Sequence, residues 1–260
     1  MEIAPSVDLF TVQGKRVLVV GGTRGIGRAI AWRLAAAGAE VVVNYVRNDE
    51  TAAQLTAAAA LAGTRITAVR ADVSSDKGRE ELRRAVEQRF AALSVLVFAA
   101  ATGIHRPYDK LSGRHFDFTF GLNVKAFLAL VQDFAPMMQA GASIIALSSE
   151  GAVHAMPQYG LVGSSKAALE SLCRHLAVEL APSGIRVNVL APGAVKTDAW
   201  SALPDADRRL AAAASRTPRG TLTTVDEVAW AAQFLASDAA SGLAGHTLVV
   251  DGGARIVGSG

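Results

Sequence analysis

The chain has 260 residues, of which 51% are hydrophobic, and it carries a net charge of +3 and a single cysteine. This length and apolar content suffice for one large buried core, and a single cysteine excludes an internal disulfide. Lysine and arginine form no run typical of a nucleic-acid surface, and no apolar run reaches the roughly 18 residues of a membrane span. Because no cationic start precedes an apolar stretch, we expect no signal peptide and a cytoplasmic location. No cluster of His, Cys and acidic residues has metal-ligand spacing, so no bound metal is expected.

Short apolar runs alternate with helical segments along the chain. The apolar runs predict strands over residues 16–20, 41–45, 67–71, 95–100, 143–148, 186–190 and 247–250. The segments between them predict helices over 26–37, 51–61, 75–91, 114–138, 159–180 and 225–236, the last opened by a capping box of Thr224 and Glu227. Strands separated by helices of this length form parallel βαβ units. Residues 1–260 are therefore predicted to form one α/β domain, a doubly wound Rossmann-type fold with a seven-stranded parallel sheet. Residues 197–220 break the alternation and are predicted to be a mobile substrate lid.

A glycine-rich loop joins the first strand to the first helix. Gly21 permits the tight turn, Gly25 leaves room where the backbone meets a pyrophosphate, and Gly27 lets the helix pack against the sheet. The helix N-terminus that follows favours anionic phosphates. A strand, a glycine loop and a helix in this order predict a dinucleotide site, with a tight turn that binds no ligand as the alternative.

The end of the second strand indicates which dinucleotide binds. NAD sites usually place an acidic residue there to hold the ribose 2′-hydroxyl, but this chain has Asn44 and Tyr45, and no acid before Asp49. Arg24 in the glycine loop and Arg47 after the strand can both donate charge-assisted hydrogen bonds to a 2′-phosphate, which a carboxylate would repel. NADPH is therefore favoured over NADH, the alternative being that an arginine is merely solvated.

Tyr159 and Lys166 are seven residues apart on the predicted helix 159–180. At about 100° per residue, seven residues complete nearly two turns, so both side chains project from one face. An ammonium next to a phenol is expected to lower the pKa of the phenol and make it a better proton donor. Beside a nicotinamide, this pair predicts hydride transfer to a polarised double bond.

These features resemble the short-chain dehydrogenase/reductase family over almost the whole chain. Further matches to its motifs are Asp72-Val73, Asn123, Ser149, Pro192-Gly193, Thr197 and the stretch 251–253. The resemblance implies catalytic roles for Tyr159, Lys166, Ser149 and Asn123. It implies a cofactor site made by Gly21, Thr23, Arg24, Gly25, Ile26, Gly27, Tyr45, Arg47, Asp72, Val73, Ala100, Lys166, Pro192, Gly193, Val195 and Thr197.

Within that family, the spacing of Tyr159 and Lys166 resembles an NADPH-dependent branch of the bacterial enoyl-acyl-carrier-protein reductases. The resemblance implies that NADPH delivers hydride to Cβ of a 2-enoyl thioester, that Tyr159 stabilises the enolate and that Lys166 holds the nicotinamide ribose. Trp200 and Leu203 in the lid are candidate contacts for the acyl chain, although oligomer packing would also use them. The family resemblance further implies a homodimer or homotetramer, with a small-molecule or carrier-bound acyl substrate.

Three departures from the family pattern qualify this interpretation. Val20 precedes the glycine loop where threonine is usual, and residues 98–101 replace an Asn-Asn-Ala-Gly stretch, which removes two amides that brace the loop near the adenosine. Val162 stands where the commoner spacing has its tyrosine. Val162 and the 98–101 stretch suggest a specialised biosynthetic enzyme.

Two alternatives stay open. One is an NADPH-dependent ketone reductase in natural-product tailoring, in which Ser149 helps Tyr159 to polarise a carbonyl. The other is a cofactor-binding scaffold or redox-neutral enzyme that has lost reductase chemistry. Among weaker candidates, His105 follows the fourth strand at the carboxyl edge of the sheet, where ligands bind in such folds, and His154 lies between Ser149 and Tyr159.

Overall fold

The computed structural model of the chain describes residues 8–197 and 206–257. At its centre lies one sheet of seven parallel strands in the order β3-β2-β1-β4-β5-β6-β7. The strands are β1 (Arg16–Val20), β2 (Glu40–Tyr45), β3 (Arg65–Arg70), β4 (Leu93–Phe98), β5 (Met138–Leu147), β6 (Arg186–Pro192) and β7 (Thr247–Val250). The order reverses between β1 and β4, which is the crevice where doubly wound folds bind their ligands.

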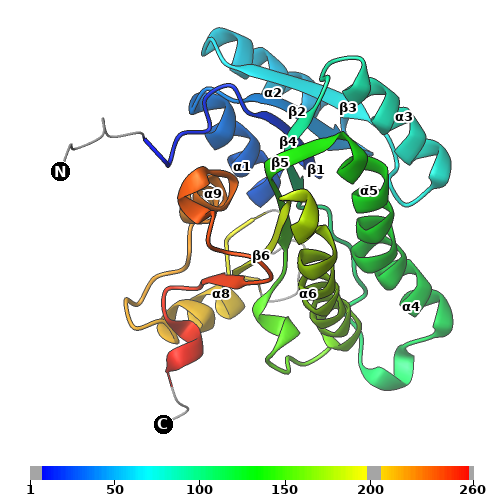
Figure 1. Cartoon of the computed structure of the whole chain (residues 1–260). Helices are drawn as coiled ribbons and strands as arrows, with labels where there is room; N and C mark the ends of the chain where they lie inside the picture. Colours follow the sequence, from blue (N-terminus) through cyan, green and yellow to red (C-terminus); the bar gives the residue numbers. More distant parts are fainter. Residues whose placement is uncertain (1–7, 198–205, 258–260) are drawn as a thin grey trace.

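Helices cover both faces of this sheet (Figure 1). They are α1 (Gly25–Ala36), α2 (Asp49–Leu61), α3 (Asp76–Glu87), α4 (Gly113–Phe120), α5 (Phe127–Phe134), α6 (Gly160–Leu180), α8 (Ala206–Ser215) and α9 (Val225–Ala236). Side chains of α3, α5 and α6 pack into one core, and those of α1, α2 and α9 pack into the other. The predicted fold class is therefore confirmed.

The alternation of side chains in a strand explains why β1 is apolar throughout. Val17 and Val19 point into the core that α1 and α9 cover, whereas Leu18 and Val20 point into the core on the opposite face. All four side chains are fully buried. A strand covered on both faces needs an uninterrupted apolar run, and this is the pattern from which the strands were predicted.

Most predicted elements differ from the structure by a few residues at their ends, and two stretches differ more. The predicted helix 114–138 is interrupted by a π-helical segment, Gly121–Ala126, and it ends before Met138, which begins β5. Composition does not reveal a π-helical turn, because its extra residue is stabilised by tertiary contacts, frequently at functional sites. Within the stretch predicted as an irregular lid, α8 forms over Ala206–Ser215, while 198–205, including Trp200 and Leu203, lie outside the described residues.

Candidate active site

The glycine loop packs so closely against neighbouring backbone that no side chain would fit at Gly21 or Gly27 without a shift. Gly21 adopts a φ of 78°, and a methyl group added there would lie 2.8 Å from the Cα of Ala100. A methyl group added at Gly27 would lie 2.2 Å from the carbonyl oxygen of Gly21. Thr23 is buried at the start of α1, and Ile26 is half-buried. The loop, Ala100 and the N-terminus of α1 thus form a narrow cradle that fits a pyrophosphate.

The same cradle meets the loop after β6. A methyl group added at Gly25, where φ is 52°, would contact the side chain of Thr197 at 3.6 Å. Thr197 ends a segment that begins with Pro192 and Gly193 and runs through Val195, which forms an isolated bridge with Thr223. The glycine loop and the loop of Pro192–Thr197, both assigned to the cofactor site by the family resemblance, therefore lie side by side, as a dinucleotide that contacts both would require.

A polar network occupies the carboxyl end of β2. The hydroxyl of Tyr45 donates to Asp49 Oδ1 at 2.8 Å, and Arg70 forms an ion pair with Asp49 Oδ2 at 3.1 Å. The hydrogen bond to Asp49 raises the pKa of Tyr45. Arg24 and Arg47 are exposed near this end of the sheet. Because Arg70 forms an ion pair with Asp49, the charge of this acid is partly neutralised. The sequence did not single out Arg70.

Asp72 and Val73, which the family resemblance assigns to the cofactor site, differ in the exposure of their side chains. Asp72 is exposed and accepts hydrogen bonds from the backbone N–H and the hydroxyl of Ser74, at 3.0 and 2.7 Å. The side chain of Val73, by contrast, is buried in the core. If Val73 contacts a nucleotide it does so through its main chain.

Tyr159 lies at the N-terminus of α6, just outside the helix itself, as its N-cap residue. Its hydroxyl donates a hydrogen bond to Ser149 Oγ at 3.2 Å, and Ser149 in turn accepts from the backbone N–H of Gly151. The ring lies against Gly151, where an added methyl group would lie 2.3 Å from the ring edge. The phenol is thereby placed at the carboxyl end of β5, at the edge of the sheet that holds the glycine loop.

Burial raises the pKa of Tyr159, and the hydrogen bond from its hydroxyl to Ser149 offsets this only in part. The predicted acidification by Lys166 is therefore wrong for this structure. The physical reason is that the ammonium of Lys166 donates to the carbonyl oxygen of Leu147 at 2.7 Å. The electrostatic effect of burial on the phenol consequently exceeds any attraction to that cation.

Lys166 is buried beneath the site, and its burial lowers its pKa to about 8. One helical turn further on, the buried Glu170 accepts a hydrogen bond of 2.5 Å from Ser148, and its charge raises the pKa of Lys166. The sequence argument missed Glu170. The available signal was an acid four residues after Lys166, which places both charges on the same face of the helix.

Asn123 lies in the π-helical segment and is fully buried. Its side-chain amide donates to the carbonyl oxygen of Thr102 at 2.8 Å and to the hydroxyl of Ser165 at 2.9 Å, and its oxygen accepts from the Thr102 N–H at 2.9 Å. Asn123 thus ties the loop after β4 to α6. In this structure it is a positioning residue for that loop and does not contact Tyr159.

Two of the departures from the family pattern have a packing explanation. Phe98 is fully buried, and its ring centroid lies 5.3 Å from that of Phe127. Val162 is buried against Gly103, where an added methyl group would come within 2.1 Å of its side chain. The side chain at position 162 is therefore an apolar group packed on Gly103. The hydroxyl that bonds Ser149 comes from Tyr159 instead.

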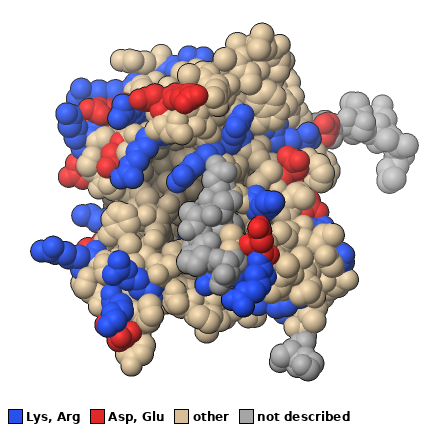
Figure 2. Space-filling view, turned by 180° about the vertical axis from the view of Figure 1, so that it is seen from behind, with Lys and Arg blue, Asp and Glu red and all other residues tan. Residues whose placement is uncertain are grey.

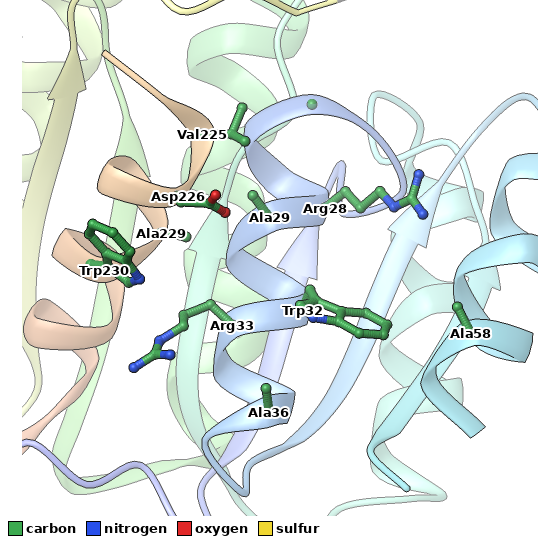
Figure 3. Close-up of a pocket in the computed structure, with 11 residues that line it drawn as sticks. Arg28, Ala29, Trp32, Arg33, Ala36, Ala58, Val225, Asp226, Ala229 and Trp230 are labelled. Carbon is green, nitrogen blue, oxygen red and sulfur yellow. The ribbon is translucent and has the colours of Figure 1, made fainter. Parts of the chain in front are cut away.

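The molecular surface shows where charged ligands would be attracted. Figure 2 shows Lys and Arg side chains bordering a hollow on the face turned away in Figure 1. A separate groove of about 470 Å³ lies on the outside of α1, where Trp32, Arg33 and Trp230 are among the residues that line it (Figure 3). It contains none of the expected catalytic residues, so it is not the active site.

Over residues 8–197 and 206–257, no three His, Cys, Asp or Glu side chains gather as a metal site would require. None of the helices in the described part of the chain is long and apolar enough to cross a membrane.

The fold and the glycine loop after β1 are those of a dinucleotide-dependent oxidoreductase. The family model described as Enoyl-(Acyl carrier protein) reductase matches residues 20–255, and the chain therefore belongs to the short-chain dehydrogenase/reductase family.

Individual relatives agree on the family and differ in reaction. The chain is 38% identical over 242 residues to 1-cyclohexenylcarbonyl-CoA reductase of Streptomyces collinus, covering 92% of this chain and 86% of that protein. It is 31% identical over 258 residues to hydroxynaphthalene reductase-like protein Arp2 of Metarhizium guizhouense, covering 94% and 96% of the two chains. A short-chain dehydrogenase from Burkholderia cenocepacia, solved in complex with NADP, superposes with a TM-score of 0.85 at 34% identity and covers 94% of this chain and 99% of its own.

Proposed function

We propose that this reductase saturates the enoyl double bond of an acyl thioester, with NADPH as the reductant. NADPH would supply the hydride that adds to Cβ. The electron pair of the double bond then shifts toward the thioester oxygen, and a proton adds to Cα. The observation that carries the proposal is the Tyr159 hydroxyl, held at the carboxyl end of β5 by its 3.2 Å hydrogen bond to Ser149.

In this proposal Tyr159 hydrogen-bonds the thioester oxygen as it becomes negative. A phenol with a raised pKa stays protonated at neutral pH, so it is available as a donor when negative charge develops. The buried cation of Lys166 lies behind it and would hold the nicotinamide ribose. Similarity to a reductase of 1-cyclohexenylcarbonyl-CoA, whose substrate is a thioester by name, supports the choice of an enoyl thioester.

The preference for NADPH rests on the cations at the end of β2. Arg24 and Arg47 are exposed where a 2′-phosphate would lie, and Asp49 is engaged by Tyr45 and Arg70. A carboxylate held in an ion pair repels a phosphate less than a free one. The structural relative that was solved with NADP supports the same choice.

A second candidate is reduction of a ketone, and one contact favours it specifically. Ser149 bonds the hydroxyl of Tyr159 directly, so two hydroxyl groups are close enough to polarise one carbonyl oxygen. Similarity to a hydroxynaphthalene reductase-like protein supports this alternative.

An assay with two different thioester substrates distinguishes enoyl reduction from ketone reduction. NADPH oxidation would be followed at 340 nm with crotonyl and acetoacetyl thioesters, each offered on coenzyme A and on an acyl carrier protein. The proposal expects turnover of the crotonyl thioester, with product of a mass two hydrogen atoms higher. Turnover of the acetoacetyl thioester alone would replace it with ketone reduction.

Self-association is a further part of the proposal. The edge strand β7 pairs on one side only, with β6, and it exposes Val249, while Trp230 on the adjacent α9 is 55% exposed. Unpaired edges and exposed apolar side chains are covered most simply by a second copy of the chain. Light scattering coupled to gel filtration would detect the homodimer or homotetramer, and a monomeric mass at micromolar concentration would contradict it.

A further inference from the structure

His105 follows β4 in the loop that Asn123 anchors through Thr102. Its ring centroid lies 5.3 Å from that of Tyr159, and the two rings are inclined by 58°. Tilted aromatic pairs at this distance are attractive, because the edge of one ring meets the face of the other. A histidine from the loop after β4 thus contacts the phenol that the proposed reaction depends on.

The helix holds the backbone of Tyr159, whose carbonyl oxygen accepts a hydrogen bond from the Gly163 N–H at 2.7 Å, but this bond does not by itself fix the position of the ring. As the N-cap residue it stands outside α6, and it is preceded by Gln158 with a φ of 63°. Gly151 supports the ring, and Ser149 bonds the hydroxyl. These contacts lie at the hydroxyl end and on the Gly151 side of the ring, and the ring of His105 adds a further contact.

The protonation state of His105 is compatible with packing on an aromatic ring. Burial lowers its pKa, and the positive charge of Arg209 on α8 lowers it further. The imidazole is therefore neutral at pH 7 and packs on Tyr159 as an uncharged ring. The charge of Arg209 on α8 is thus close enough to His105 to act on it.

We propose that His105 is a positioning residue that holds the Tyr159 ring against Gly151 and keeps its hydroxyl on Ser149. This inference rests on the proposed function, in which the Tyr159 hydroxyl meets the substrate oxygen. His105 acts through the phenol by ring packing, and it transfers no proton.

The contact is tested first without any substrate. The chain contains only three tyrosines, so uniform labelling with 3-fluorotyrosine yields three ¹⁹F resonances, and loss of one in Tyr159→Phe assigns Tyr159. His105→Ala is expected to shift or broaden that resonance and to leave Tyr45 unchanged as an internal reference. His105→Phe, which retains a ring, is expected to restore a single sharp Tyr159 resonance. An unaltered Tyr159 resonance in His105→Ala would overturn the proposal.

Activity is then measured with whichever thioester the wild-type protein reduces. His105→Ala is expected to lower kcat roughly tenfold or more, because a misplaced catalytic group costs rate while binding survives, and the KM for NADPH should stay within twofold. His105→Phe should recover kcat to within about threefold, and His175→Ala, a change at an exposed histidine on α6, should have no effect. Equal loss in His105→Phe and His105→Ala would show that imidazole chemistry matters and would reject ring packing. If Tyr159→Phe keeps full activity, the proposed function fails, whereas the ¹⁹F spectra still decide the contact.

Discussion

The ammonium of Lys166 points to the carbonyl oxygen of Leu147, at 2.7 Å, and this contact binds α6 to the end of β5. The next residue, Ser148, donates its hydroxyl to Glu170, so the lysine and the carboxylate are both anchored at the same strand end. The ammonium is thereby held in a buried position at the end of β5, two residues before Ser149, which bonds Tyr159. Its charge depends on pH in a range where enzymes are assayed.

The first prediction concerns this pH dependence. The pKa of Lys166 is about 8, so the cation is present below that pH and is lost as the pH rises through it. If the cation holds the cofactor ribose, kcat/KM for NADPH should be constant near pH 6.5–7.5 and fall above roughly pH 8. Glu170→Gln should move this alkaline limb to lower pH, because the charge of Glu170 raises the pKa of Lys166. A limb that moves to higher pH would contradict the assignment.

The second prediction concerns the phenol. Tyr159→Phe removes the hydroxyl and keeps the ring against Gly151, so cofactor binding should survive while kcat falls by roughly 10²–10³, the usual cost of losing one oxyanion donor. Ser149→Ala removes the partner of that hydroxyl. In the enoyl reaction we expect it to cost roughly tenfold or less, and in a ketone reaction considerably more. Steady-state kinetics on both variants would check this, and unchanged kcat in Tyr159→Phe would remove Tyr159 from the mechanism.

The third prediction concerns Asn123. Asn123→Ala deletes three buried hydrogen bonds and leaves both backbone groups of Thr102 without this partner. We expect the free energy of unfolding to fall by about 2–4 kcal/mol in urea titrations. Ser165→Ala deletes one of the three bonds, together with the hydrogen bond from Ser165 to the carbonyl oxygen of Val162, and should cost about 1–2 kcal/mol. Equal losses in the two variants would show that the Thr102 loop does not depend on Asn123.

The fourth prediction concerns the glycine cradle. In Gly27→Ala the new methyl group would meet the carbonyl oxygen of Gly21 at 2.2 Å, so the loop must shift. The NADPH dissociation constant should rise at least tenfold, and the protein should lose roughly 1–3 kcal/mol of stability through overpacking. Gly113→Ala is the matched control, because nothing lies within 4 Å of the added methyl group at the start of α4. Fluorescence titration of NADPH and thermal unfolding measure both effects, and equal behaviour of the two variants would contradict the cradle.

The fifth prediction concerns cofactor choice. Arg24→Ala and Arg47→Ala should each weaken NADPH binding by roughly 10–100-fold, the value of one charge-assisted hydrogen bond, and should leave NADH binding within twofold. Arg70→Ala frees the Asp49 carboxylate and should also weaken NADPH selectively. The measurement is a titration of each variant with both dinucleotides. Parallel losses for NADPH and NADH would show that these arginines do not contact a 2′-phosphate.

Local sequence patterns predict those elements of the fold whose conformation depends on nearby residues. Residues 16–20, 225–236 and 247–250 are predicted with the bounds that the structure has. A doubly buried strand such as β1 requires a continuous apolar run, and a capping box marks the start of α9. The π-helical segment at Asn123 and the helix α8 were missed. Their conformations depend on contacts with Thr102 and with the rest of the chain, which no local window contains.

By itself the sequence determined the parallel sheet, the glycine loop and the residue types at the site, since these depend on periodicity and on backbone sterics. Only the tertiary structure decided how the site residues pair. It joined Tyr159 to Ser149 and set Val162 against Gly103, and it turned Lys166 away toward Leu147. Such pairings are decided by packing between segments far apart in the chain, and the same burial that builds the site shifts the pKa values of its phenol upward and of its ammonium downward.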